Sequence, residues 1–152
     1  MTTQIRAETS FTLPVPPAEA FALVSDPAND PDWQTACVYS RVVDGPPRPG
    51  CHYEITFKMI GKQMDFSVEI LDYEPGIVSR FRTLDGPFGY CGTYSYTGLA
   101  DGGTSVHWLF EVDPGAYFGI TPTSLVKKLL IAQVKKDSTK LAGRLRAAEL
   151  ER

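Results

Sequence analysis

The sequence is poor in the residues that build metal centres and disulfide frameworks. It contains only two histidines, His52 and His107, and three scattered cysteines, Cys37, Cys51 and Cys91, with no Cys-x-x-Cys pair. So few nitrogen and sulfur ligands disfavour a zinc site or other His-rich metal chemistry. An odd number of separated cysteines is typical of reduced thiols in the cytosol. We therefore predict no metal and no cofactor.

Basic surplus and long apolar runs are also lacking. The formal net charge is −3 at pH 7, whereas nucleic-acid binding usually shows as an excess of basic residues. No apolar run approaches the about 18 residues of a membrane-spanning helix, and residues 1–8 lack the apolar core of a signal peptide. We expect a cytoplasmic protein with no nucleic-acid partner and no integral membrane segment.

The remaining composition is that of a single globular domain spanning residues 1–152. Hydrophobic residues make up 43% of the chain and charged residues 22%, which are ordinary proportions for a protein with one core. One domain is the default at this length. Neither an internal repeat nor a low-complexity linker divides the chain.

The C-terminal region predicts one long helix, from Thr121 to about Glu149. Thr121 suits the N-cap position and Pro122 the first helical position, where its missing N–H costs nothing. At 1.5 Å per residue this helix would extend over roughly 40 Å. Apolar residues recur in it at helical spacing and form one stripe, namely Val126, Leu130, Val134, Leu141, Leu145 and Ala148, widened near the start by Leu125, Leu129 and Ala132.

Alternating apolar and polar residues before this helix predict seven strands, at residues 5–14, 37–43, 51–59, around 64–70, 77–84, 90–98 and 105–112. In the fifth strand, Ile77, Ser79 and Phe81 are predicted to point inward. Two short helices, from Pro17 to about Ser25 and from Asp26 to near Trp33, separate the first two strands. Tight glycine and proline turns between strands three to seven imply an antiparallel meander with one buried face. The predicted fold class is α+β: a seven-stranded curved antiparallel sheet wrapped around the long C-terminal helix.

Four segments stand in a characteristic order before the final helix: Leu13–Phe21, Asp26–Trp33, Asp85–Phe88 and Gly103–Trp108. Together with the order of elements, they resemble the START-like SRPBCC superfamily, which has the helix-grip fold and includes Bet v 1-like proteins and polyketide cyclases. The resemblance implies a deep apolar cavity between sheet and helix, where members bind lipids, hormones, pigments or aromatic polyketides. The superfamily has no universal catalytic motif, so no catalytic residue is implied.

Aromatic side chains predominate among the residues that alternation assigns to the inner face of the sheet. Such rows more often form core than pocket, but the helix-grip resemblance favours a pocket. Buried phenols need hydrogen-bond partners, which a ligand or water would supply. The predicted ligand-binding residues are Trp33, Tyr53, Phe57, Met64, Phe66, Phe81, Phe88, Tyr90, Tyr94, Tyr96, Trp108, Phe110, Tyr117, Phe118 and Gln133.

Successive turns of a meander alternate between the two ends of the sheet. The turns at Gly61, at residues 86–88 and at residues 114–119 should therefore lie at one end, where they carry aromatic side chains beside glycines. We hypothesise that the cavity opens at this end, because mobile loops often carry binding functions. The alternative is that these aromatic side chains simply cap the core.

Asp137 interrupts the apolar stripe of the long helix, where an aspartate costs free energy unless it is paired. In one interpretation Asp137 faces the cavity as a ligand anchor or as a general acid/base with a raised pKa. Tyr94 and Tyr53 would then be further proton-shuttling groups. In the other interpretation Asp137 lies at the edge of the stripe and pairs with Lys140, Arg144 or a sheet residue.

Several functions stay open. The first is a module that binds a small hydrophobic, aromatic or polyketide-like molecule. The second, implied by the resemblance, is a polyketide cyclase/dehydratase-type enzyme that works largely by positioning its substrate. Aromatase/cyclases tend to carry a cavity arginine on a central strand, where the fourth strand here has apolar residues, which disfavours this choice. A non-catalytic lipid or small-molecule carrier and a protein-interaction domain with a filled core are the alternatives.

Two statements about partners complete the predictions. The basic residues of the long helix are interpreted mainly as a solvated face, and contact with an acyl carrier or an anionic lipid is the weaker interpretation of the same residues: Lys127, Lys128, Lys135, Lys136, Lys140 and Arg144. Both a monomer and a homodimer are compatible with the sequence.

Overall fold

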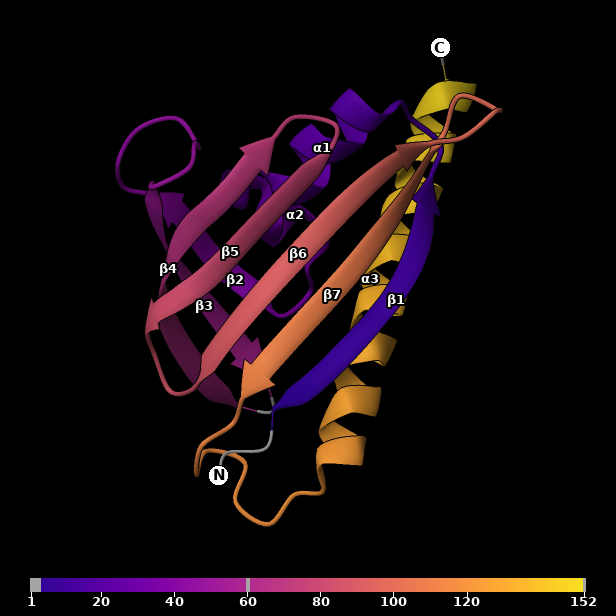
Figure 1. Ribbon diagram of the computed structural model, residues 1–152. Helices are drawn as coiled ribbons and strands as arrows, with labels where there is room; N and C mark the ends of the chain where they lie inside the picture. Colours follow the sequence, from indigo (N-terminus) through magenta and orange to yellow (C-terminus); the bar gives the residue numbers. More distant parts are fainter. Residues whose placement is uncertain (1–3, 60, 152) are drawn as a thin grey trace.

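The computed structural model describes residues 4–59 and 61–151 and shows an antiparallel sheet with one long helix beside it (Figure 1). The strands are β1 (Ile5–Leu13), β2 (Cys37–Val42), β3 (His52–Met59), β4 (Lys62–Glu74), β5 (Val78–Asp85), β6 (Gly89–Gly98) and β7 (Thr104–Asp113). The helices are α1 (Pro17–Ser25), the short 3₁₀ helix η1 (Pro27–Asn29), α2 (Asp30–Trp33) and α3 (Thr123–Leu150). The predicted helix-grip α+β fold is confirmed.

The seven strands follow the order β1-β7-β6-β5-β4-β3-β2, and every neighbouring pair is antiparallel. β3 to β7 form the predicted meander, while α1, η1 and α2 connect β1 at one edge to β2 at the other. The register between β4 and β5 shifts at Ser67/Val68 and at Ile70/Asp72. Such bulges bend a strand and increase its twist, so the sheet curves around the space beside α3.

α3 begins one residue later than predicted, at Thr123 rather than Pro122. Pro122 occupies the N-cap position with an extended backbone, and Thr121 belongs to the preceding turn, where its N–H bonds to the Phe118 carbonyl at 3.0 Å. Leu125 and Leu129 are 45% and 56% exposed, because the first turns of α3 extend beyond the ends of β1 and β7 (Figure 1). None of the helices in residues 4–59 and 61–151 has the length and apolar character to cross a bilayer.

The fifth strand also differs from its prediction at one position. Ile77 was expected to point inward, but it is 60% exposed and its N–H closes a turn onto the Glu74 carbonyl at 2.9 Å. The strand begins at Val78, and Ser79 is buried as predicted. A turn residue is not bound by strand alternation, which explains the error.

Candidate functional site

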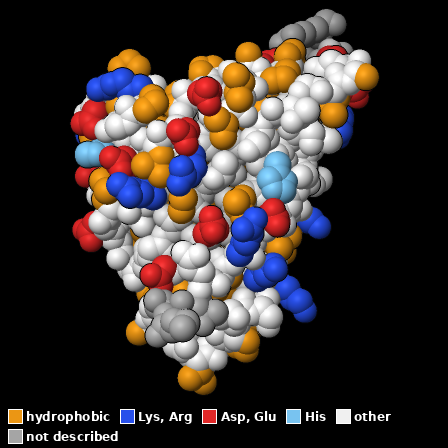
Figure 2. All heavy atoms as spheres, in the orientation of Figure 1, with side chains coloured by type: hydrophobic (Ala, Val, Ile, Leu, Met, Phe, Trp, Pro, Cys, Tyr) orange, Lys and Arg blue, Asp and Glu red, His pale blue; other side chains and the backbone are white. Residues whose placement is uncertain are grey.

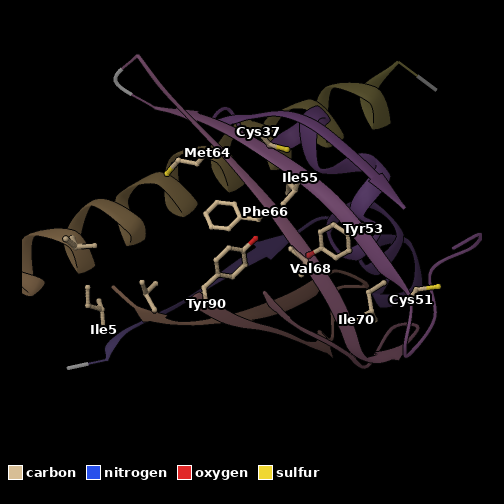
Figure 3. Close-up of a cluster of buried hydrophobic side chains, with 12 residues drawn as sticks. Ile5, Cys37, Cys51, Tyr53, Ile55, Met64, Phe66, Val68, Ile70 and Tyr90 are labelled. Carbon is tan, nitrogen blue, oxygen red and sulfur yellow. The ribbon is translucent and has the colours of Figure 1, made fainter. Parts of the chain in front are cut away.

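A cavity of about 540 Å³ lies between the sheet and α3. Its volume is within the range of about 300–1,000 Å³ that is usual for small-molecule sites. Figure 3 shows part of its wall, where Met64, Phe66 and Tyr90 project from the sheet toward α3. With the exception of Tyr96, all predicted ligand-binding residues line this cavity, namely Trp33, Tyr53, Phe57, Met64, Phe66, Phe81, Phe88, Tyr90, Tyr94, Trp108, Phe110, Tyr117, Phe118 and Gln133.

Tyr96 is buried under α1 rather than exposed to the cavity. Its ring packs against Phe21 with a centroid distance of 5.2 Å. Its hydroxyl forms a hydrogen bond with Ser25 Oγ, which in turn lies 2.6 Å from Ser79 Oγ. The alternation of β6 correctly places Tyr96 on the inner face, but the helix that covers this end of the strand already supplies the partner that its phenol needs.

The three turns that should share one end of the sheet do meet there. The Phe88 ring lies 5.1 Å from the rings of both Tyr117 and Phe118, and Lys62 Nζ lies 6.0 Å from the Tyr117 ring centroid. Lys62 and Tyr117 are exposed and also line the cavity, so the cavity reaches the surface between these turns. Figure 2 shows hydrophobic side chains at the lower tip of the molecule, where the segment between β7 and α3 lies in Figure 1.

Tyr53, Tyr90 and Tyr94 place phenol groups in the cavity wall. Each side chain is more than nine-tenths buried, and within the described part of the chain none of the three hydroxyls has a hydrogen-bond partner. Burial raises the pKa of all three well above the usual phenol range, and the charge of Asp30 adds to each rise. The three groups are therefore neutral hydrogen-bonding groups at physiological pH, and a ligand or water would find unpaired hydroxyls here.

Asp30 is a cavity residue that the sequence analysis did not single out. It is the first residue of α2, is 7% exposed, and lines the cavity beside Trp33 and Gln34. Burial raises the pKa of its carboxyl group well above the usual value and the charge of Asp26 raises it further, while the nearby side chains of Trp33 and Gln34 lower it. The indole N–H of Trp33 is buried without a hydrogen-bond partner among the described residues.

Asp137 both faces the cavity and is paired. It is 3% exposed, and its Oδ1 accepts hydrogen bonds from Thr35 Oγ1 at 2.6 Å and Gln133 Nε2 at 3.0 Å. The partners are therefore not those the sequence suggested, since Arg144 instead donates to the Asp32 carbonyl at 2.8 Å. Within residues 4–59 and 61–151 no tyrosine bonds to Asp137, so the catalytic roles of Asp137, Tyr53 and Tyr94 stay predictions.

Among the described residues, basic side chains reach the cavity only from its rim. Lys62 lies over Tyr117, and Arg80 is exposed and forms an ion pair with Asp72 at 3.5 Å. The three cysteines are free thiols, and across the described ranges no group of three His, Cys, Asp or Glu side chains is arranged to hold a metal ion.

Solved structures share this architecture at low sequence identity. A Thermus thermophilus protein, TTHA0849, is similar with a TM-score of 0.77 and 21% identity over 94% of this chain and 98% of that one. A START superfamily protein from Mycobacterium smegmatis is similar with a TM-score of 0.76 and 16% identity, over 94% of this chain and 98% of that one. The di-domain ARO/CYC BexL from the BE-7585A biosynthetic pathway is similar with a TM-score of 0.69 and 17% identity, over 93% of this chain and 46% of that one. No curated protein matches the sequence.

A family model adds sequence evidence to this structural likeness. Residues 4–148 match the family described as polyketide cyclase / dehydrase and lipid transport. The match includes every strand, the short helices and nearly all of α3. The chain therefore belongs to the polyketide cyclase / dehydrase and lipid transport family, within the START-like SRPBCC superfamily that its sequence resembles.

Proposed function

We propose that this protein binds a small, uncharged aromatic or polyketide-like molecule in the cavity between its sheet and α3. The observation that carries the proposal is the set of unpaired hydroxyls of Tyr53, Tyr90 and Tyr94 in a largely apolar wall. A buried polar group without a partner costs about 1–3 kcal/mol. A ligand that supplies oxygen atoms to these hydroxyls would remove that cost.

The wall around the hydroxyls favours a flat ring system. The Phe66 and Phe110 rings lie 5.0 and 4.9 Å from the Tyr90 ring, and the Trp108 and Phe110 rings are stacked at 5.6 Å. Aromatic pairs at these separations contribute about 0.5–1.5 kcal/mol beyond the area they bury. An aromatic ligand would extend this packing into the cavity.

The other interpretations fit less well. A filled core would leave no space of about 540 Å³, which disfavours a pure protein-interaction domain. A proton-transfer mechanism through Asp137 would need an acid–base pair near 3 Å, but the bonding partners of Asp137 are Thr35 and Gln133. An acyl carrier contact at the exposed lysines of α3, and the choice between monomer and homodimer, stay predictions of the sequence.

Tryptophan fluorescence offers a direct test, because the only two tryptophans of the chain, Trp33 and Trp108, both line the cavity. We expect 2-acetonaphthone to quench this fluorescence saturably at micromolar concentrations, and native mass spectrometry to show one bound molecule. Free tryptophan and the urea-unfolded chain control for absorption by the probe. No saturable quenching by aromatic ketones, phenols or fatty acids would contradict the proposal and favour an interaction domain.

A further inference from the structure

The cavity contains a cluster of polar groups that a purely hydrophobic ligand would leave unsatisfied. Asp30 and Trp33 lie one helical turn apart in α2, and the Trp33 ring is 6.3 Å from the Tyr94 ring. The Trp33 indole N–H is buried without a hydrogen-bond partner within the described ranges, and the same cavity is lined by Asp30, Tyr53, Tyr90 and Tyr94. An unpaired donor among four further polar side chains in one cavity wall indicates a site for the polar part of a ligand.

The chemistry of these groups specifies what they can bind. An indole N–H donates only, and a neutral phenol or carboxylic acid donates one hydrogen bond. A cluster so rich in donors is complementary to an oxygen with free lone pairs. It is not complementary to a carboxylate ligand, because the basic side chains of the described lining, Lys62 and Arg80, stand at the rim and contact Tyr117 and Asp72.

We propose that Asp30 and Trp33, together with the surrounding tyrosine hydroxyls, form a carbonyl-binding site in which Asp30 donates a hydrogen bond to a ketone oxygen of the ligand. The inference rests on the proposed function and narrows its ligand to aryl ketones and quinones. A carboxylic acid that an apolar site keeps neutral is a strong donor to such an oxygen, and it polarises the C=O bond.

The titratable groups around Asp30 favour its protonated, donating form, whereas the side chains of Trp33 and Gln34 oppose it. The groups that interact electrostatically with Asp30 are Asp26 at the start of η1, Cys37 on β2, Tyr53 on β3, Tyr73 on β4, and Tyr90, Tyr94 and Tyr96 on β6. All are acidic or neutral, and burial raises the pKa of both Cys37 and Tyr73 to about 12. With no described cation among them, burial of the Asp30 carboxyl group raises its pKa without opposition from a positive charge.

A matched series of naphthalene probes tests the site. The probes are 2-acetonaphthone, 2-naphthoate, 2-naphthylmethylamine and 2-ethylnaphthalene, each titrated by tryptophan fluorescence between pH 5 and pH 10. We expect the ketone to bind at least tenfold more tightly than the anion or the cation at pH 6, and to weaken as the pH rises. The infrared stretch of its carbonyl group should move to lower frequency on binding.

Two variants of Asp30 test the carbonyl-binding site separately from the ligand cavity on which it rests. Asp30→Leu should weaken binding of the ketone at least tenfold and reduce the infrared shift of its carbonyl group, while 2-ethylnaphthalene binds as before. Asp30→Asn keeps a hydrogen-bond donor but cannot titrate, so its affinity for the ketone should stay within a few fold of wild type and should no longer depend on pH. This variant also tests the proposal if the leucine variant fails to fold. Asp137→Asn, a second buried carboxyl group in the same wall, is the control and should keep the pH dependence.

The outcomes are distinct. If ketone and hydrocarbon bind equally and Asp30→Leu changes neither, the carbonyl site is overturned and the ligand cavity stands. If the amine binds most tightly and Asp30→Leu abolishes that preference, Asp30 acts as an anion and the proposal is wrong. If no probe binds, the proposed function itself fails.

Discussion

Replacing Asp30 with asparagine is expected to stabilise the ligand-free protein against unfolding at pH 8, and to do so much less at pH 4. A buried carboxyl group without a partner costs the folded state about 1–3 kcal/mol, and more when it is charged. Asparagine has nearly the same shape and never ionises. Urea unfolding at the two pH values measures the difference in the free energy of unfolding between wild type and variant.

The direction follows from proton linkage. Burial raises the pKa of Asp30 in the folded state, while in the unfolded chain the group ionises near its ordinary pKa of about 3.9. As the pH rises above about 4, the unfolded state releases its proton before the folded state does, so the folded state loses stability until the pH passes the folded pKa. Below the ordinary pKa both states are protonated, and the wild type bears no such penalty.

Asp32→Asn supplies the control for this experiment. Asp32 lies on the same short helix α2 but is exposed, so its replacement should change the free energy of unfolding by a small amount that is alike at both pH values. Equal effects of Asp30→Asn at pH 4 and pH 8 would show that Asp30 is not desolvated. A stabilised variant that also loses the pH dependence of ketone binding would indicate that the site is maintained at the expense of stability.

The sheet and the long helix were predictable because their signals are local and repeated. Apolar residues alternate with polar ones along β3 (Tyr53, Ile55, Phe57) and along β7 (Val106, Trp108, Phe110). The inner face of each strand could therefore be predicted from the sequence alone. The same periodicity predicted most of the residues that line the cavity, because a helix-grip sheet turns one face toward its helix. Meander parity also placed the turns that meet at Phe88 and Tyr117.

Asp30 was missed because nothing local marks it as buried. α2 is a single turn, too short to display an apolar stripe, and its segment contains the exposed Asp32 as well as the buried Asp30. Burial arises only when α2 packs against β2, which follows it closely in the sequence, and against α3, which lies far along the chain. One usable signal existed: Asp30 precedes the predicted pocket residue Trp33 by three positions, and residues so spaced share a helix face.

For Tyr96 and Asp137, the sequence predicted the orientation of the side chain but not its hydrogen-bond partner. Alternation identified the inner face for Tyr96 but not which neighbour covers it, so the bond from Ser25 could not be anticipated. Asp137 was recognised as an anomaly in the stripe, yet its partner Thr35 lies over a hundred positions away, before β2. Periodicity predicts orientation, whereas the identity of a polar partner depends on tertiary packing.

Gly86→Ala should be among the most destabilising single substitutions outside the core, by about 2–4 kcal/mol from combined backbone strain and overpacking. Gly86 has a φ of +150°, which disfavours any residue with a Cβ atom, and a Cβ built there would lie 2.3 Å from Phe66 Cδ1. Phe66 cannot retreat easily, because its ring packs against Phe88 and Tyr90 at 5.1 and 5.0 Å. Urea unfolding measures the loss.

Gly102→Ala separates the two causes. Gly102 has a φ of +88°, but a Cβ there would meet no atom within 4 Å, so only the backbone term of about 1 kcal/mol applies. Combining Gly86→Ala with Phe66→Leu should recover part of the packing loss, since a smaller side chain leaves room for the methyl group. Equal losses in the two glycine variants would contradict a steric role for Phe66. Because Phe66 also lines the cavity, Gly86→Ala alone should weaken 2-acetonaphthone binding, whereas Gly102→Ala should leave it unchanged.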